Sequence, residues 1–204
     1  WAPAACRSAS TSSARPVGVP ALTPATIPAL LERHGLAPSR ALGQNFLADP
    51  NTARRIVRLA NVGAGDHVLE IGPGIGSLTT ALLDAEAEVT AIELDRHVIP
   101  ALREVVGDAV RVVPGDALTV DLAGVLGDPA GGPHVLVANL PYNVATPIVM
   151  RFLEDAPQIT TMLVMVQREV GERLAAGPGT KTYGAPSVKV AYFATARVVG
   201  LVPP

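Results

Sequence analysis

The stretch from Val68 to Ser77 constrains this chain more than any other, because it joins a short apolar segment to a glycine-rich turn. Its first four residues, Val-Leu-Glu-Ile, are typical of a buried strand. Glycines 72, 74 and 76 permit positive φ and let a ligand approach the backbone without meeting a Cβ. Apolar residues from Leu78 onward follow at helical spacing. The stretch therefore predicts a strand, a tight turn and a helix whose first N–H groups suit an anionic or strongly polar ligand.

The spacing of these glycines differs from the dinucleotide-binding fingerprint, Gly-x-Gly-x-x-Gly, whose third glycine would fall at Ser77. An acidic residue, Glu70, stands two positions ahead of the first glycine. The pattern argues against NAD as the ligand. A glycine turn by itself is also compatible with a plain tight turn that binds nothing.

Downstream of Asp66, predicted strands and helices alternate at intervals that imply right-handed crossovers and a parallel sheet covered on both faces. We expect an α/β fold with a doubly wound, mostly parallel sheet, occupying residues 22–204 as one domain. The Ala-, Pro- and Ser-rich residues 1–21 are expected to form a disordered tail. The predicted strands are His67–Ile71, Glu88–Glu93, Ala109–Val113, His134–Asn139, Thr161–Gln167 and Arg197–Val202. The predicted helices are Ile27–His34, one starting at Asp49-Pro50, Ser77–Ala85, Arg96–Val106, Thr146–Asp155, Arg168–Ala175 and Ala185–Phe193.

Composition narrows the class of protein. With 204 residues, 49% of them hydrophobic, the chain can bury one full core. A single cysteine, Cys6, rules out an internal disulfide framework, and the four histidines are too widely spaced for a helical or hairpin metal site. No apolar run approaches ~18 residues, so no membrane span is expected. These features predict a cytoplasmic, metal-free monomer.

Charge is distributed unevenly, although the net charge is only −2. Residues 1–60 carry seven arginines against two acids, residues 61–139 three against twelve, and residues 140–204 six basic residues against four acids. Basic flanks around an acidic centre suit a polyanionic partner such as nucleic acid, although an ordinary solvated surface explains them equally well. Arg54, Arg55 and Arg58 on the second predicted helix are the candidate phosphate contacts.

Polar residues stand at the carboxyl ends of four predicted strands, where ligands of doubly wound sheets bind. They are Glu70 with Gly72, Glu93 with Asp95, Asp116, and Asn139. A carboxylate that ends the second strand can accept two hydrogen bonds from a ribose diol, and Asp116 can accept one from an adenine amino group. Together these residues predict a ligand that contains adenosine.

Six short motifs, taken in order, resemble those of the ribosomal RNA adenine dimethyltransferases, which methylate small-subunit RNA with S-adenosylmethionine. The resemblance covers about residue 22 to the end. The motifs are Gly43-Gln44-Asn45-Phe46-Leu47, Glu70-Ile71-Gly72-Pro73-Gly74, Ile92-Glu93-Leu94-Asp95, Gly115-Asp116-Ala117-Leu118, Asn139-Leu140-Pro141-Tyr142-Asn143 and Val166-Gln167-Arg168-Glu169-Val170.

The resemblance implies S-adenosyl-L-methionine as cofactor and ribosomal RNA of the small subunit as partner. It implies that Asn45, Leu47 and Gly72 line the methionine end, Glu93 holds the ribose, Asp116 holds the adenine and Asn139 lies between cofactor and target base. Two departures stand out: Pro186 occupies a position that is usually leucine, and the chain stops before the family's last antiparallel strand and its small helical domain.

The chemistry of this reaction agrees with the residues that follow the fourth strand. An exocyclic adenine amine is a poor nucleophile, and a sulfonium is a good leaving group, so no strong base is required. The Asn139 side-chain oxygen and a backbone carbonyl at Leu140 or Pro141 can hold the two amine hydrogens and direct the lone pair. Tyr142 offers a face for a flipped base, although it is also compatible with an ordinary core aromatic.

Two other functions fit the same fold. One is the related large-subunit adenine methyltransferase of macrolide resistance; the other is a non-catalytic RNA-binding assembly or transcription factor. Asn139-Leu140-Pro141-Tyr142 and Gly43 before Gln44 favour the small-subunit enzyme over the first. Intact Glu93, Asp116 and Asn139 argue against the second.

Overall fold

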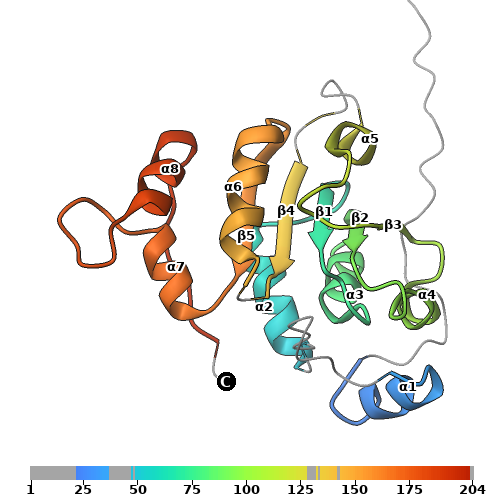
Figure 1. Ribbon diagram of the computed structural model, residues 1–204. Helices are drawn as coiled ribbons and strands as arrows, with labels where there is room; N and C mark the ends of the chain where they lie inside the picture. The colour runs from blue at the N-terminus through green and yellow to red at the C-terminus, as the bar shows by residue number, and fades with distance from the viewer. Residues whose placement is uncertain are drawn as a thin grey trace, which may run out of the picture.

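The computed structural model describes residues 22–36, 47, 49–127, 132, 134–141 and 143–202. Five parallel strands form one sheet in the order β3-β2-β1-β4-β5 (Figure 1). The glycine-rich turn follows the central strand β1, which pairs with β2 on one side and β4 on the other. The predicted α/β fold with a parallel sheet is therefore confirmed, and its first and fourth strands are adjacent. Tail residues 1–21 lie outside the described residues.

The strands and helices alternate along the chain as follows. The strands are β1 (His67–Ile71), β2 (Glu88–Glu93), β3 (Val110–Pro114), β4 (His134–Asn139) and β5 (Ile159–Met165). The helices are α1 (Ile27–Arg33), α2 (Pro50–Ala60), α3 (Ser77–Asp84), α4 (Ile99–Val106), α5 (Leu122–Leu126), α6 (Ala145–Asp155), α7 (Arg168–Leu174) and α8 (Ala185–Phe193). Each crossover from one parallel strand to the next contains a helix, as parallel pairing demands.

Two hydrophobic clusters cover the two faces of the sheet. Alternate residues of β1 belong to different clusters: Val68 lies in the cluster that includes residues of α1, α2, α3 and α4, whereas Leu69 and Ile71 lie in the one that includes residues of α5, α6, α7 and α8. Phe152 of α6 is fully buried in the second cluster. Burial on both faces explains why the strands read as nearly continuous apolar runs.

Helix starts follow the local chemistry of the sequence. Asp49 caps α2 as predicted, because its carboxylate accepts from the N–H groups of Asn51 and Thr52 while Pro50 takes the first helical position. The pair Thr146-Pro147 is typical of a cap followed by the first helical residue, but that expectation is wrong, since α6 begins at Ala145 and Pro147 stands third. Pro100 falls inside the predicted helix Arg96–Val106, where a kink or a restart is expected. Helix α4 begins only at Ile99, so Pro100 lies in its first turn and its missing N–H leaves no bond unmade.

The largest difference from the predicted elements concerns residues 197–202. They form no strand; this segment has no regular secondary structure and is exposed, and Leu201 accepts a hydrogen bond from Arg55 of α2 at 3.1 Å. Local alternation of valine and leucine satisfies strand propensity, but a strand also needs a partner for its backbone groups. Within the described residues, β5 is the last strand at that edge of the sheet.

Smaller differences concern single elements. The third strand is shifted by one residue and β5 begins two residues before its predicted start, while α5 was not predicted. Helix α8 spans its predicted residues, and Pro186 is accommodated as its second residue. No helix among the described residues is long and apolar enough to cross a membrane.

Candidate functional site

The carboxyl ends of the central strands converge on one cavity. Backbone hydrogen bonds continue past the strands: Gly72 N–H donates to Ile92 at 2.9 Å, and Gly115 N–H donates to the carbonyl of Glu93 at 2.8 Å. These bonds hold the loops after β1, β2 and β3 side by side. Residues from all of them, together with the segment after β4, line the cavity, as predicted from the strand ends.

Two of the glycines in the turn serve different purposes. Gly72 has φ +69° and lines the cavity, and a Cβ at this position would meet no described atom within 4 Å. Gly76 has φ +95°, and a Cβ there would lie 3.0 Å from Cδ1 of Leu102 on α4. The first glycine therefore keeps the backbone accessible to a ligand, whereas the last one permits the turn to pack against α4.

Glu93 ends β2 and is 6% exposed. Its Oε2 accepts from the N–H of Gly74 at 2.9 Å and its Oε1 from the N–H of Asp95 at 2.8 Å. Burial raises the pKa of Glu93, and the two backbone N–H groups oppose that rise. Each carboxylate oxygen has further lone pairs, so the side chain can still accept hydrogen bonds from a pair of hydroxyl groups in the cavity.

Asp116 begins a tight turn after β3. Its Oδ1 accepts from the N–H of Leu118 at 2.8 Å, and its carbonyl accepts from Thr119 and Val120. The carboxylate is therefore fixed by its own backbone rather than by a distant partner. Ala117 and Leu118 line the cavity beside it and supply an apolar wall, as a planar heterocycle requires.

Asn139, Leu140 and Pro141 follow β4 and line the same cavity. Leu140 is buried, and its N–H donates to the carbonyl of Met165 at 2.9 Å. The carbonyl of Pro141 accepts from Val144 and Ala145 at the start of α6. Leu47 also lines the cavity. The other two predicted site residues, Asn45 and Tyr142, lie outside the described residues.

Glu70, which the sequence placed among the strand-end residues without a role of its own, and Ser77 also line the cavity. Glu70 Oε2 and Ser77 Oγ are buried and have no hydrogen-bond partner among the described residues. Burial raises the pKa of Glu70 to about 8; the Thr79 hydroxyl opposes this rise, and the negative charge of Glu93 adds to it. The available signal was the acid two residues ahead of the first glycine.

The described lining of the cavity is acidic. It contains Glu70, Glu93, Asp95 and Asp116, and it includes no lysine, arginine or histidine. A pyrophosphate would be repelled here, whereas a ligand with hydroxyl groups and positive charge would be favoured. The orphaned Glu70 and Ser77 oxygens fit such a ligand, because an ammonium or hydroxyl group can satisfy them.

The described residues contain no group of three or more His, Cys, Asp or Glu side chains that could hold a metal ion.

The arginines of α2 are exposed, as expected from the amphipathic pattern, and Arg54 and Arg55 donate to Asn51 and Leu201. The structure thus presents the candidate phosphate contacts on the surface of α2.

The fold is a Rossmann-like α/β domain with an acidic cavity at the carboxyl ends of its central strands. Residues 37–204 match the family model described as ribosomal RNA adenine dimethylase. The chain belongs to this family. It is 50% identical over 188 residues to the ribosomal RNA small subunit methyltransferase A of Nocardia farcinica, a match that covers 89% of this chain and 63% of the relative. It is 51% identical over 177 residues to the protein of the same name in Magnetococcus marinus, covering 86% and 63%.

Two solved structures share the fold. A dimethyladenosine transferase from Plasmodium falciparum superposes with a TM-score of 0.61 at 27% identity, over 72% of this chain and 52% of that one. The 23S rRNA methyltransferase ErmE superposes with a TM-score of 0.56 at 34% identity, over 64% and 51%. The chain spans about two thirds or less of the length of each of these proteins.

Proposed function

We propose that this chain transfers methyl groups from S-adenosyl-L-methionine to the exocyclic amines of adenines in small-subunit ribosomal RNA. The observation that carries the proposal is the acidic cavity, in which Glu93 and Asp116 stand next to Asn139, Leu140 and Pro141. S-adenosylmethionine is a nucleoside with a sulfonium and an ammonium group, and it supplies an activated methyl group when bound. Glu93, Asp95 and Asp116, without a basic residue in the described lining, favour that charge, and the protonated Glu70 adds a polar group.

Each cavity residue then has a role in holding the cofactor. Glu93 accepts from the two ribose hydroxyl groups, and Asp116 accepts from the adenine amino group. Gly72 and Leu47, with Asn45, line the methionine end. Apolar contacts from Ala117 and Leu118 complete the adenine pocket.

The residues after β4 orient the target amine. The Asn139 side-chain oxygen accepts one amine hydrogen, and a backbone carbonyl accepts the other, so that the nitrogen lone pair points toward the methyl group. The carbonyl of Pro141 already accepts two N–H groups of α6, which favours the carbonyl of Leu140 for this role. Tyr142 stacks on the flipped base.

Exposed Arg54, Arg55 and Arg58 on α2 supply phosphate contacts to the RNA. The names of the curated relatives support the small-subunit substrate, while the likeness to ErmE makes the large subunit the second candidate. We propose that the protein acts in the cytoplasm, where ribosomal RNA is found, and as a monomer at low concentration.

The test is methyl transfer from labelled S-adenosylmethionine to small ribosomal subunits that lack the modification, followed by nucleoside analysis. We expect labelled dimethyladenosine in small-subunit RNA, with large-subunit RNA as the comparison. Asn139→Ala should lower turnover far more than cofactor affinity, because it removes an acceptor for the amine and leaves Glu93 and Asp116 in place. Cofactor binding without any transfer would instead support the non-catalytic RNA-binding function.

A further inference from the structure

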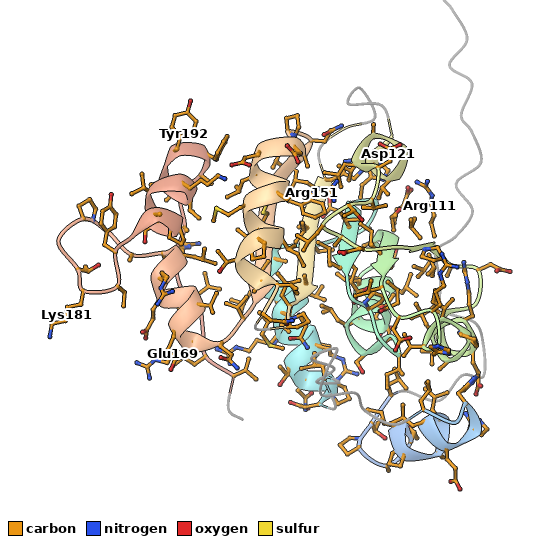
Figure 2. All side chains as sticks on the ribbon, viewed as in Figure 1. Arg111, Asp121, Arg151, Glu169, Lys181 and Tyr192 are labelled. Carbon is orange, nitrogen blue, oxygen red and sulfur yellow. The ribbon has the colours of Figure 1, made fainter. Side chains whose placement is uncertain are left out.

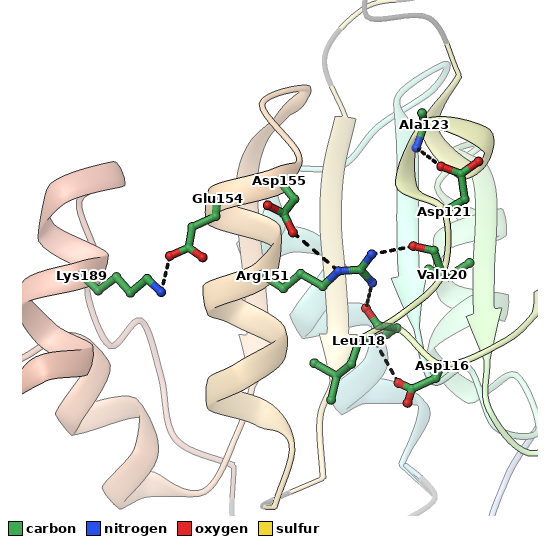
Figure 3. Close-up of polar contacts among 10 residues, drawn as sticks. Asp116, Leu118, Val120, Asp121, Ala123, Arg151, Glu154, Asp155 and Lys189 are labelled. Carbon is green, nitrogen blue, oxygen red and sulfur yellow. Dashed lines mark hydrogen bonds and ion pairs between the residues drawn. The ribbon is translucent and has the colours of Figure 1, made fainter.

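Arg151 of α6 connects the helix that follows Asn139 with the turn that follows β3. Its Nη1 donates to the carbonyl of Ala117 and its Nη2 to the carbonyl of Val120, each at 2.5 Å. The Asp155 carboxylate, one helical turn further along α6, lies 3.7 Å from Nε. Figure 3 shows the guanidinium between α6 and the turn. The side chain is 18% exposed, so water competes little for these bonds.

The two carbonyls belong to opposite ends of the turn that carries Asp116 and Leu118. Within the turn, Asp116 already accepts from the N–H groups of Leu118, Thr119 and Val120. Those internal bonds fix the shape of the turn but do not fix its distance from β4 and α6. A planar guanidinium with two parallel donors does so, because it holds both carbonyls at one spacing from one helix.

Arg111 of β3 offers a comparison within the same molecule. It also donates to two backbone carbonyls, those of Val125 and Gly124, each at 2.8 Å. Those carbonyls lie in α5, and neither residue lines the cavity. Figure 2 labels both arginines. The two side chains make similar contacts, but only Arg151 holds a part of the cavity wall.

We propose that Arg151 is a positioning residue for adenine recognition, because it fixes the Asp116–Val120 turn against α6 so that the Asp116 carboxylate meets the adenine amino group. The inference rests on the proposed function and deepens it. Arg151 does not contact the nucleoside. It acts through the turn, and it links the adenine pocket to α6, the helix that follows Asn139, Leu140 and Pro141.

The experiment measures discrimination between two ligands by calorimetry on the folded chain. S-adenosylhomocysteine carries an amino group at C6, whereas S-inosylhomocysteine carries an oxygen there, which the Asp116 carboxylate disfavours. We expect the parent chain to prefer the adenosine ligand by at least about tenfold, the size of a lost charge-assisted hydrogen bond. Arg151→Met should reduce that ratio by about threefold or more while the affinity for the inosine ligand changes little. Arg151→Lys should recover part of the ratio.

Two controls separate positioning from general stability. Arg111→Met should lower the melting temperature and leave the ratio unchanged. Asp116→Asn should lower the ratio itself, and adding Arg151→Met to it should lower the ratio no further, because both changes act on one contact. If Arg151→Met unfolds the chain, the ratio is measured on Arg151→Lys instead, which should keep only part of it.

The outcomes are distinct. A parent chain that binds neither ligand would overturn the proposed function. Three other results would overturn the role of Arg151 while leaving the cofactor site intact. The parent chain binds both ligands equally, or an Arg151 variant keeps the full ratio, or that variant loses affinity for both ligands alike.

Discussion

At the scale of single residues, the buried carboxyl group of Glu70 gives the clearest consequence for stability. Its pKa is about 8 in the folded chain because it is fully buried, against an ordinary value of 4.5. Between those two values the folded state binds the proton and the unfolded state does not. Glu70 therefore stabilises the fold fully below pH 4.5, and that contribution is lost as the pH rises toward 8.

Glu70→Gln should remove this dependence, because a carboxamide keeps the shape of the protonated acid and does not titrate. Between pH 5 and pH 8, the urea midpoint of the parent chain should fall relative to that of the variant. The corresponding loss in free energy of unfolding is at most about 1.4 kcal/mol per pH unit. Glu93→Gln is the matched control. The pKa of Glu93 is also raised by burial, but its carboxylate accepts hydrogen bonds from two backbone N–H groups that oppose the rise. Parallel profiles for the parent and Glu70→Gln would show that Glu70 is ionised throughout.

Sequence reasoning at this scale found Glu93, Asp116 and Asn139, because strand ends place polar residues at one edge of a parallel sheet. It could not assign Glu70 or Arg151. The environment of Glu70 depends on how α3 closes over β1, and the partners of Arg151 are carbonyls 34 and 31 residues earlier in the chain. No local pattern encodes either contact.

At the scale of elements, the glycine-rich turn connects β1 and α3, and substitutions of its glycines should have different effects. Gly76→Ala brings a Cβ to 3.0 Å from Leu102 at φ +95°, so both strain and overpacking apply. Its unfolding free energy should fall by about 1–3 kcal/mol. The Cβ of Gly72→Ala, at φ +69°, meets no described atom within 4 Å, but the residue lines the cavity.

Thermal melting and ligand titration of the two variants test this division. Gly76→Ala should lose more stability, and Gly72→Ala should lose more affinity for S-adenosylhomocysteine than its stability loss explains. Equal effects of both substitutions on affinity and stability would contradict the different purposes assigned to the two glycines.

Element boundaries show where local patterns stop being informative. The cap at Asp49 and the strands β1, β2 and β4 follow from their own residues, and they were predicted with the bounds that the structure shows. Segment 197–202 has strand-like residues but no described neighbour that pairs with it, so propensity alone misled. The five-residue helix α5 was missed because it carries little periodic signal.

At the scale of the whole molecule, apolar side chains are exposed around α8 and the segment after it. Tyr192 is 83% exposed and Leu201 is 57% exposed, and Val188, Phe193 and Val198 are also exposed. Figure 1 shows α7 and α8 at one end of the domain, next to the last described residues. Exposed apolar side chains of this kind promote association between molecules.

We therefore expect this 204-residue chain to self-associate in a concentration-dependent way. Sedimentation velocity over a range of concentrations measures it, and the double substitution Tyr192→Glu and Leu201→Glu should shift the distribution toward the monomer. Neither residue lines the acidic cavity, so binding of S-adenosylhomocysteine should not change. A parent chain that stays monomeric at every concentration would show that these exposed side chains do not cause self-association.

The central claim is that the acidic cavity at the strand ends binds S-adenosylmethionine through Glu93, and calorimetric titration tests it most directly. The parent chain should bind the cofactor with one site per chain, and folded Glu93→Ala should bind it at least about tenfold more weakly, because two charge-assisted hydrogen bonds to the ribose are lost. Absence of binding to the folded parent chain, or unchanged affinity in folded Glu93→Ala, would contradict the account.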